Sequence, residues 1–229
     1  MRQAAAGVET EEEGGGDTQY YLEFNGTTSG VDCGSDSSLD DLHSADFTAE
    51  GWFWYDAAID STAALLIKGV SLSVGWALFR LTTVNKVYIR VNLDSSDATT
   101  NYDLGGTGAW FHVAATYDAA TKTTELFVDG TSRGSNTGSG DIVSDAGDNL
   151  VIGQAGAGAS LAGRAAWIRL SNNKRYTSNF TPDAKDSPPA VDANTIEQWN
   201  FNDGSGATAT AEVNSSNNGT ITDGSWGVL

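Results

Sequence analysis

The chain has 229 residues, and its 12 lysine and arginine residues against 30 aspartate and glutamate residues give a formal net charge of −18 at pH 7. Because nucleic acid and anionic membrane surfaces repel such a protein, and because no stretch approaches the roughly 18 apolar residues of a membrane span, neither nucleic-acid binding nor membrane insertion is expected. The single cysteine, Cys33, excludes an intrachain disulfide, so stability must come from a packed core.

Residues 1–18 contain alanine, glutamate and glycine and offer almost no side chain that a core could bury. This composition predicts a flexible acidic arm. Two interpretations of the arm remain open: a solvated tail, or a segment that becomes ordered when it binds a partner. Residues 19–229 are predicted to form one domain.

The domain has the pattern of an all-β protein, in which short runs of alternating apolar and polar residues are separated by Gly, Asn, Asp and Ser. The first run centres on Leu22 and Phe24, and Asp129-Gly130 predicts a tight hairpin. Further strands are predicted, in chain order, around Val31 and Cys33 and at 47–56, 64–68, 76–83, 86–93, 110–117, 123–128, 131–133, 150–153, 165–171, 195–201 and 218–221. About a dozen strands without a crossover helix favour a two-sheet antiparallel jelly-roll sandwich.

A set of apolar side chains falls at alternate positions of these strands and is predicted to fill the layer between the two sheets. It comprises Phe47, Phe53, Val113, Ala115, Tyr117, Leu126, Val128, Ile168, Leu170, Trp199 and Phe201. Cys33 alternates with Val31 and is predicted to be a small buried residue rather than a reactive thiol.

Several segments, taken in order, carry a resemblance to a known family: LEFNGTTSGVDCG (22–34), FTAEGWFWYD (47–56), WFHVAATYD (110–118), ELFVDG (125–130), LVIG (150–153), WIRLSNNKRYTSNFTP (167–182) and WNFNDGSG (199–206). Together they resemble the laminin-G-like, concanavalin A-like jelly roll over about residues 20–229. The resemblance implies two curved antiparallel sheets with the terminal strands paired. The segment RYTSNFTP (175–182) is most similar to versions from bacteriophage and marine bacterial proteins, which are often structural or adhesive.

No constellation in the sequence predicts catalysis. Glycoside hydrolases of this fold place carboxylates at Glu-x-Asp-x-x-Glu along one strand, and here Glu50 has no partner carboxylate on its own strand. His43 and His112 are far apart and outside any His-Glu-x-x-His pattern, so no zinc site is predicted, and His112 is interpreted as a structural hydrogen-bonding residue. We therefore expect a protein that is not an enzyme and has no catalytic residue.

Calcium is the one cofactor that the sequence suggests. The resemblance implies a calcium ion at the rim of the sandwich, and aspartate-rich loops at 36–41 and 141–148 supply the oxygen ligands that calcium prefers. The candidate ligands are Asp36, Asp40 and Asp41. The alternative is that these loops carry only solvated turn carboxylates.

The alternation of side chains between the two faces of a strand also predicts which residues face away from the core. With Phe47 and Phe53 pointing inward, Glu50, Trp52 and Trp54 should lie on the outer, concave face of their sheet, and Trp167 and Arg169 should share that face. One interpretation is a platform where indole rings stack on a sugar while Glu50 and Arg169 bind its hydroxyls. The other is that loops or a neighbouring subunit cover the rings.

These observations favour a non-catalytic structural and binding protein displayed on a larger assembly, most plausibly a phage virion decoration or tail-associated protein with glycan-binding capacity. Its partners would then be a capsid or tail protein, bound through the N-terminal arm, and a cell-surface glycan, and it would lie on the virion surface. The alternative is a bacterial carbohydrate-binding or adhesion module, extracellular or on the cell surface. A glycosidase of the same fold is the third hypothesis.

Overall fold

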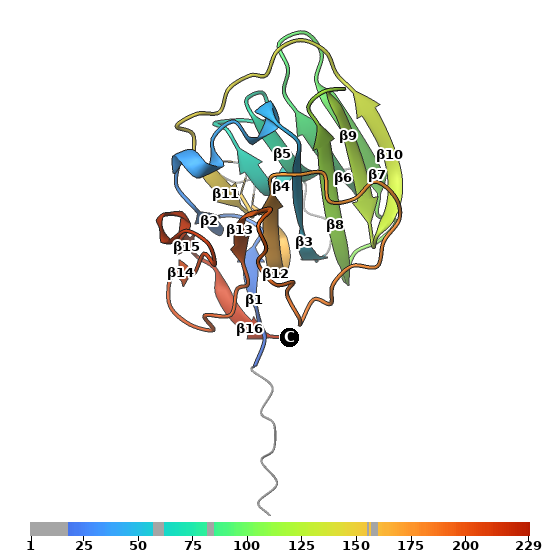
Figure 1. Cartoon of the computed structure of the whole chain (residues 1–229). Coiled ribbons are helices and arrows are strands. Elements are labelled where there is room, and N and C mark those ends of the chain that lie inside the picture. The colour runs from blue at the N-terminus through green and yellow to red at the C-terminus, as the bar shows by residue number, and fades with distance from the viewer. Residues whose placement is uncertain (1–17, 57–61, 82–84, 155, 157–159) are drawn as a thin grey trace, which may run out of the picture.

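A computed structural model of the protein describes residues 18–56, 62–81, 85–154, 156 and 160–229 (Figure 1). The predicted arm, apart from Thr18, lies outside the described residues. The regular secondary structure of the described chain consists of β-strands, with a few 3-10 turns of three residues. Within these ranges, no helix has the length and apolar character needed to cross a membrane. The all-β prediction is confirmed.

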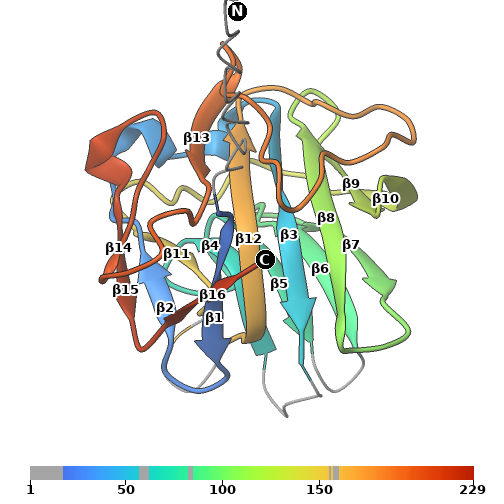
Figure 2. The same ribbon diagram turned by 90° about the horizontal axis from the view of Figure 1, so that it is seen from below.

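Two antiparallel sheets form the sandwich (Figures 1 and 2). Sheet A has the order β10 (Thr131–Thr137), β9 (Thr123–Val128), β8 (Ala109–Asp118), β3 (Phe47–Tyr55), β12 (Ala162–Ser171), β1 (Tyr20–Asn25) and β16 (Ser225–Val228), and β13 (Thr195–Trp199) also pairs with β12. Sheet B has the order β14 (Thr208–Ala209), β15 (Gly219–Thr222), β2 (Gly30–Asp32), β11 (Leu150–Ile152), β4 (Thr62–Lys68), β5 (Trp76–Leu81), β6 (Lys86–Val91) and β7 (Ala98–Asp103).

The core lies between the sheets, and it contains every residue that period 2 predicted there. Phe47, Phe53, Val113, Ala115, Tyr117, Leu126, Val128, Ile168, Leu170, Trp199 and Phe201 are all buried in one hydrophobic cluster. Cys33 is buried in the same cluster, and burial raises the pKa of its thiol well above the ordinary value. Its interpretation as a packing residue is therefore confirmed.

The pairing of β3 with β12 contains an irregularity at the middle of sheet A. Phe53 pairs with Ala165 but Gly51 pairs with Ile168, so β12 contains one extra residue over this stretch. A Cβ atom at Gly51 would lie 2.6 Å from the carbonyl oxygen of Trp167. Glycine is therefore required at position 51 by the close approach of the bulged strand.

The hairpin turn at Asp129-Gly130 is confirmed, with both residues in the left-handed region at φ 49° and 68°. A Cβ atom at Gly130 would lie 1.9 Å from the carbonyl oxygen of Phe180, whose N–H donates to the Gly130 carbonyl at 2.9 Å. The turn thus anchors residues 172–194, here called the covering segment.

The two chain ends of the domain meet on one edge of sheet A. Tyr20 pairs in register with Val228, and the N–H of Leu229 donates to the carbonyl of Gln19 at 3.0 Å. This confirms the pairing of terminal strands that the resemblance implied. Figure 1 shows the C-terminus at the end of the sandwich opposite the 3-10 turns of residues 37–44.

Candidate functional site

The residues predicted to form a sugar-stacking platform do lie on the outer face of sheet A. Glu50 of β3 pairs in register with Arg169 of β12, whose Nε donates to Glu50 Oε1 at 2.8 Å. The hydroxyl of Tyr176 donates to Oε2 at 2.8 Å, and Nε2 of His112 lies 3.3 Å from the same oxygen. Burial alone would raise the pKa of Glu50, but His112, Arg169 and Tyr176 together hold it below the ordinary value. The carboxylate is therefore held ionised inside the protein.

The covering segment lies across this face, as the orange chain in front of β12, β3 and β8 in Figure 2 shows. The rings of Tyr176 and Phe180 stack with centroids 3.5 Å apart and planes 3° from parallel. Carbonyl oxygens at positions 183 and 184 accept hydrogen bonds from the indole N–H groups of Trp52, at 2.8 Å, and Trp167, at 3.0 Å. Main-chain and aromatic contacts thus fix the segment over the sheet.

The prediction of an open platform is wrong for three of its five residues. Glu50 and Trp167 are 0% exposed and Arg169 is 4% exposed, because the covering segment fills the space that a sugar ring would need. The packing interpretation describes these residues correctly. His112 is also fully buried, between Glu50 and the neighbouring rings, which fits a structural role. Neither of its ring nitrogens makes a hydrogen bond within the described part of the chain, so the predicted hydrogen bonding is not confirmed.

Trp52 and Trp54 remain half-buried. The guanidinium carbon of Arg164 lies 5.1 Å from the centroid of the Trp54 ring, and the indole N–H donates to Asp56 Oδ1 at 2.9 Å. One face of Trp54 is therefore already occupied by a cation. A glycan-binding role for these two tryptophans stays a prediction.

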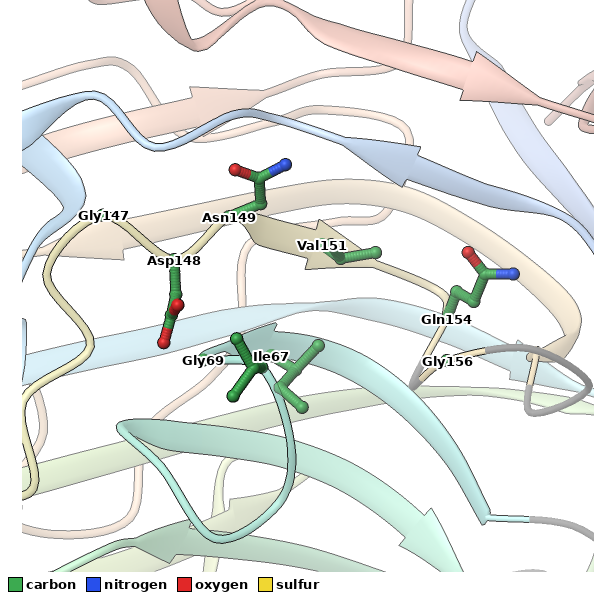
Figure 3. A pocket seen from close by; sticks show the side chains of 9 residues that line it. Ile67, Gly69, Gly147, Asp148, Asn149, Val151, Gln154 and Gly156 are labelled. Atoms are coloured by element: carbon green, nitrogen blue, oxygen red, sulfur yellow. The ribbon is translucent and has the colours of Figure 1, made fainter.

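A pocket of about 410 Å³ opens on the outer face of sheet B (Figure 3). It is lined by residues of β4, the β4–β5 turn and the chain on both sides of β11: Ile67, Gly69, Val70, Gly147, Asp148, Asn149, Val151, Gln154 and Gly156. Figure 3 shows Asp148 extending toward Gly69 and Ile67. The volume lies within the range of about 300 to 1,000 Å³ that is usual for small-molecule sites.

The pocket combines an apolar wall with planar polar groups. Ile67, Val70 and Val151 supply the aliphatic surface, and Val70 is 78% exposed. The amide of Asn149 donates to both carboxylate oxygens of Asp32 at 2.9 Å, and this contact fixes its orientation. Within the described part of the chain, the carboxylate of Asp148 makes no hydrogen bond.

The predicted calcium ligands do not meet. Asp36 Oδ1 accepts from the N–H of Ser38 at 2.9 Å and caps a 3-10 turn, whereas Asp40 Oδ1 accepts from the ammonium of Lys68 at 2.7 Å. Among the described residues, Asp36, Asp40 and Asp41 do not form a group whose carboxylates converge. An ammonium group already holds Asp40 and the carboxylate of Asp36 caps a turn, so these three side chains do not converge on one point, and calcium binding stays a prediction.

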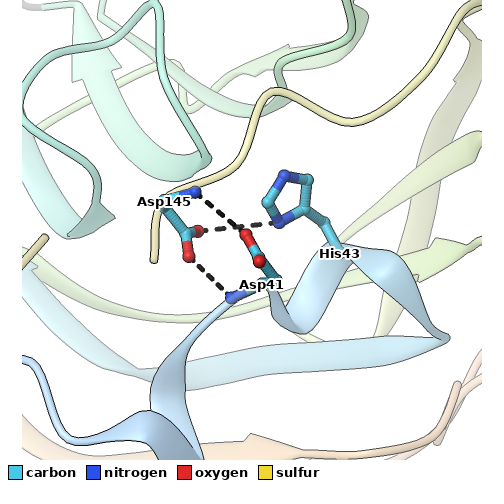
Figure 4. A group of neighbouring side chains, drawn as sticks. All are labelled: Asp41, His43 and Asp145. Atoms are coloured by element: carbon cyan, nitrogen blue, oxygen red, sulfur yellow. Dashed lines mark hydrogen bonds and ion pairs between the residues drawn. The ribbon is translucent and has the colours of Figure 1, made fainter. Parts of the chain in front are cut away.

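A different set of side chains does converge where the two aspartate-rich loops cross (Figure 4). Asp41, His43 and Asp145 bring ligand atoms within 4.8 Å of one another. Burial raises the pKa of Asp145 to about 7, and the nearby carboxylates of Asp41 and Asp40 act in the same direction against the hydrogen bond from Asp41 and the charge of Lys68. Both of the loops named from composition contribute to this cluster, but among the predicted ligands only Asp41 belongs to it.

A sequence profile described as the laminin-G-like form of the concanavalin A-like lectin/glucanase superfamily matches residues 25–164. The chain belongs to this superfamily. Among curated proteins, none matches the sequence. The family assignment agrees with the resemblance that the sequence motifs carry and with the two-sheet sandwich.

Solved structures share the superfamily's fold. A candidate carbohydrate-binding protein from Bacteroides ovatus has a TM-score of 0.61 and 15% identity over 93% of this chain, which spans 60% of the length of that protein. A heptameric pentraxin from Limulus polyphemus has a TM-score of 0.51 and 11% identity, covering 71% of this chain and 80% of its own. The match to the mouse laminin α1 domains LG4-5 has a TM-score of 0.50 and 18% identity, and it covers 76% of this chain and 48% of the laminin chain. At these identities the likeness establishes the fold.

Sequence reasoning missed both the pocket and the convergent cluster of this superfamily member. The pocket residues lie in three separate stretches, none of which carries a recognisable motif. His43 and Asp145 are far apart in the chain, and neither falls in a metal-binding spacing. The signal that could have suggested the cluster was the pair of aspartate-rich loops.

Proposed function

We propose that the protein is a non-catalytic carbohydrate-binding domain, and the pocket on the outer face of sheet B carries this proposal. Sugars present C–H surfaces beside hydroxyl groups, so their sites combine apolar walls with a few oriented polar side chains. The apolar wall of this pocket is provided by Ile67, Val70 and Val151. Its polar side chains are Asp148 and Asn149. The related fold of the candidate carbohydrate-binding protein from Bacteroides ovatus supports the proposal.

The surroundings of Glu50 support a non-catalytic role. Retaining and inverting glycosidases use two carboxyl groups that face the sugar, one of which stays protonated as the acid. The polar partners of Glu50 are Arg169, His112 and Tyr176, and its pKa is lowered rather than raised. The covering segment also separates it from solvent. Glu50 therefore has the environment of a buried counter-ion.

Replacing Asp148 by alanine is expected to weaken glycan binding roughly tenfold or more, because a hydrogen bond to a charged group contributes about 1.5 to 3 kcal/mol. A glycan array would identify a bound oligosaccharide, and isothermal titration would compare its affinity for the parent and the variant. Val70→Ser should weaken the same affinity by removing apolar contact.

Asp141→Ala is the matched control, since Asp141 is an exposed aspartate of the same loop outside the pocket. It removes the same charge and should leave the affinity unchanged. Binding that survives both pocket substitutions would place the site elsewhere, and an array without any retained glycan would count against the proposed function.

We propose as a second role that the domain is displayed on a larger assembly, with a phage virion as the leading candidate and a bacterial surface as the alternative. The supporting observation is the position of the chain ends. Gln19 and Leu229 are joined by a main-chain hydrogen bond at one edge of sheet A, so an attachment there leaves the pocket of sheet B free. The arm that would make the attachment lies outside the described residues.

Deleting residues 1–18 is expected to leave the melting temperature nearly unchanged, because β1 begins at Tyr20 and the described core begins at Leu22. The same deletion should abolish co-sedimentation with the assembled particle if the arm is the attachment. Thermal unfolding and sedimentation with purified particles would measure the two effects. If co-sedimentation were unchanged, the arm would be a solvated tail that takes no part in the attachment.

A further inference from the structure

The crossing of the two aspartate-rich loops is built by reciprocal hydrogen bonds. The N–H of Asp41 donates to Asp145 Oδ1 at 2.7 Å, and the N–H of Asp145 donates to Asp41 Oδ1 at 3.0 Å. The hydroxyl of Ser144 donates to Asp41 Oδ2 at 3.1 Å. Each carboxylate thus holds the other loop's main chain through one oxygen. Oδ2 of Asp145 is buried and has no hydrogen-bond partner among the described residues.

His43 points its free nitrogen at that oxygen (Figure 4). Its Nε2 lies 3.0 Å from the carbonyl of Val143, and because a carbonyl only accepts, Nε2 carries the hydrogen. In the neutral ring Nδ1 is then an acceptor, and it lies 3.6 Å from Asp145 Oδ2. Both side chains are 0% exposed. Two acceptors that face each other in a dry interior are unfavourable unless a cation lies between them.

The charges around the crossing leave room for a divalent cation. Among the described residues, Lys68 is the only cation that acts on Asp145, which also faces the carboxylates of Asp40 and Asp41. The ammonium of Lys68 is held by Asp40 Oδ1 and by the carbonyl of Asp148, so it does not fill the gap between His43 and Asp145. Gly75 packs closely against the same carboxylate, since a Cβ atom there would lie 2.6 Å from Asp145 Oδ2.

The donor set selects the kind of ion. Calcium takes six to eight oxygen ligands, whereas an imidazole nitrogen with two carboxylates is typical of zinc and similar transition metals. Bond lengths of about 2.1 Å at a tetrahedral ion place neighbouring ligand atoms about 3.4 Å apart. The 3.6 Å between His43 Nδ1 and Asp145 Oδ2 is close to that value. Asp41 is only partly buried and gives the ion an approach from solvent.

We propose that Asp41, His43 and Asp145 bind one divalent transition-metal ion, with zinc the best match to the donors. The ion would clamp residues 40–45 to residues 141–149, and the second of these loops continues into Gly147, Asp148 and Asn149 of the pocket wall. The site is argued from its own geometry and does not depend on glycan binding.

The test uses tag-free full-length protein stripped with a chelator and then titrated with zinc chloride. One equivalent should bind by isothermal titration, and the melting temperature should rise by roughly 5 to 10 °C at a hundredfold excess over the dissociation constant. Cobalt chloride should give the visible absorption of a tetrahedral cobalt centre. Calcium chloride should give no comparable shift.

Asp145→Asn is the decisive variant because it is expected to fold. Its amide oxygen can still accept from the N–H of Asp41, and its NH₂ group can donate to His43 Nδ1 in place of the cation. It should lose the zinc-dependent shift, whereas Asp141→Asn, the same change in the same loop, should keep it. If the parent bound neither zinc nor cobalt, a proton shared between His43 Nδ1 and Asp145 Oδ2 would take the place of the metal ion, and the proposal would be overturned. An equal zinc shift in Asp145→Asn, or a larger one with calcium, would overturn it as well.

Discussion

Replacing Arg169 by leucine is expected to destabilise the domain by about 3 to 5 kcal/mol, the cost of leaving a buried charge without its partner. Arg169 and Glu50 are 5% and 0% exposed at their side chains, and Nη2 lies 2.7 Å from Glu50 Oε1. Tyr176 and His112 cannot supply the lost permanent charge. Urea unfolding of the parent and the variant would measure the difference in free energy.

Arg164→Leu is the matched control, because Arg164 lies on the same strand but forms a half-exposed pair with Glu23 at 3.3 Å. Exposed pairs and cation–π contacts contribute little, so a loss of about 1 kcal/mol is expected. The double variant Glu50→Leu/Arg169→Leu should recover most of the stability, since it removes both buried charges. Similar losses for Arg169→Leu and Arg164→Leu would contradict the buried-pair account.

The sandwich could be predicted from the sequence because the alternation of apolar and polar residues within each strand shows which side chains face the core. Phe47, Phe53, Val113 and Ile168 lie at alternate positions of their strands, and a one-residue slip would expose them all. β7 was missed because its sequence, ATTNYD, is polar. It pairs with β6 at the edge of sheet B, and its alternation is carried by Ala98 and Thr100 rather than by large apolar residues.

The cover over sheet A could not be predicted in the same way. Period 2 correctly placed Trp52, Trp167 and Arg169 on one face, but it says nothing about what lies above that face. The covering segment has no regular alternation, and its anchors are main-chain carbonyls that any residue could provide. Its contact with Gly130 joins positions 50 residues apart, which a single sequence does not reveal.

The loop crossing illustrates the same limit at greater range. Asp41 and Asp145 are 104 positions apart, and their contact depends on how β3 and β11 are arranged in the two sheets. Composition marked both loops as acidic, but it assigned the site to Asp36, Asp40 and Asp41 on one loop. Tertiary structure instead divides them: Asp36 caps a turn, Asp40 binds Lys68, and Asp41 faces His43 and Asp145.

Replacing Phe53 by aspartate is expected to prevent folding. Phe53 is 0% exposed and packs in the core between the sheets. Removing a buried phenylalanine costs about 3 to 5 kcal/mol, and burying an unpaired carboxylate costs several more. Together they match a total domain stability of about 5 to 15 kcal/mol. Far-UV circular dichroism and size-exclusion chromatography should show an unfolded or aggregated chain.

The variant Trp54→Asp tests whether Phe53→Asp prevents folding because residue 53 faces the core, and not because any aspartate in β3 would do so. Trp54 is the next residue of β3, half-buried on the outer face, where its ring meets Trp110 edge-on with centroids 6.0 Å apart. An aspartate there can reach solvent, so the variant should fold with a loss of about 1 to 3 kcal/mol. Because the two substitutions introduce the same charge one residue apart, only the alternation of the strand separates their outcomes. A folded Phe53→Asp variant with a near-parental melting temperature, or two variants that unfold alike, would contradict the assignment of the Phe53 face to the core.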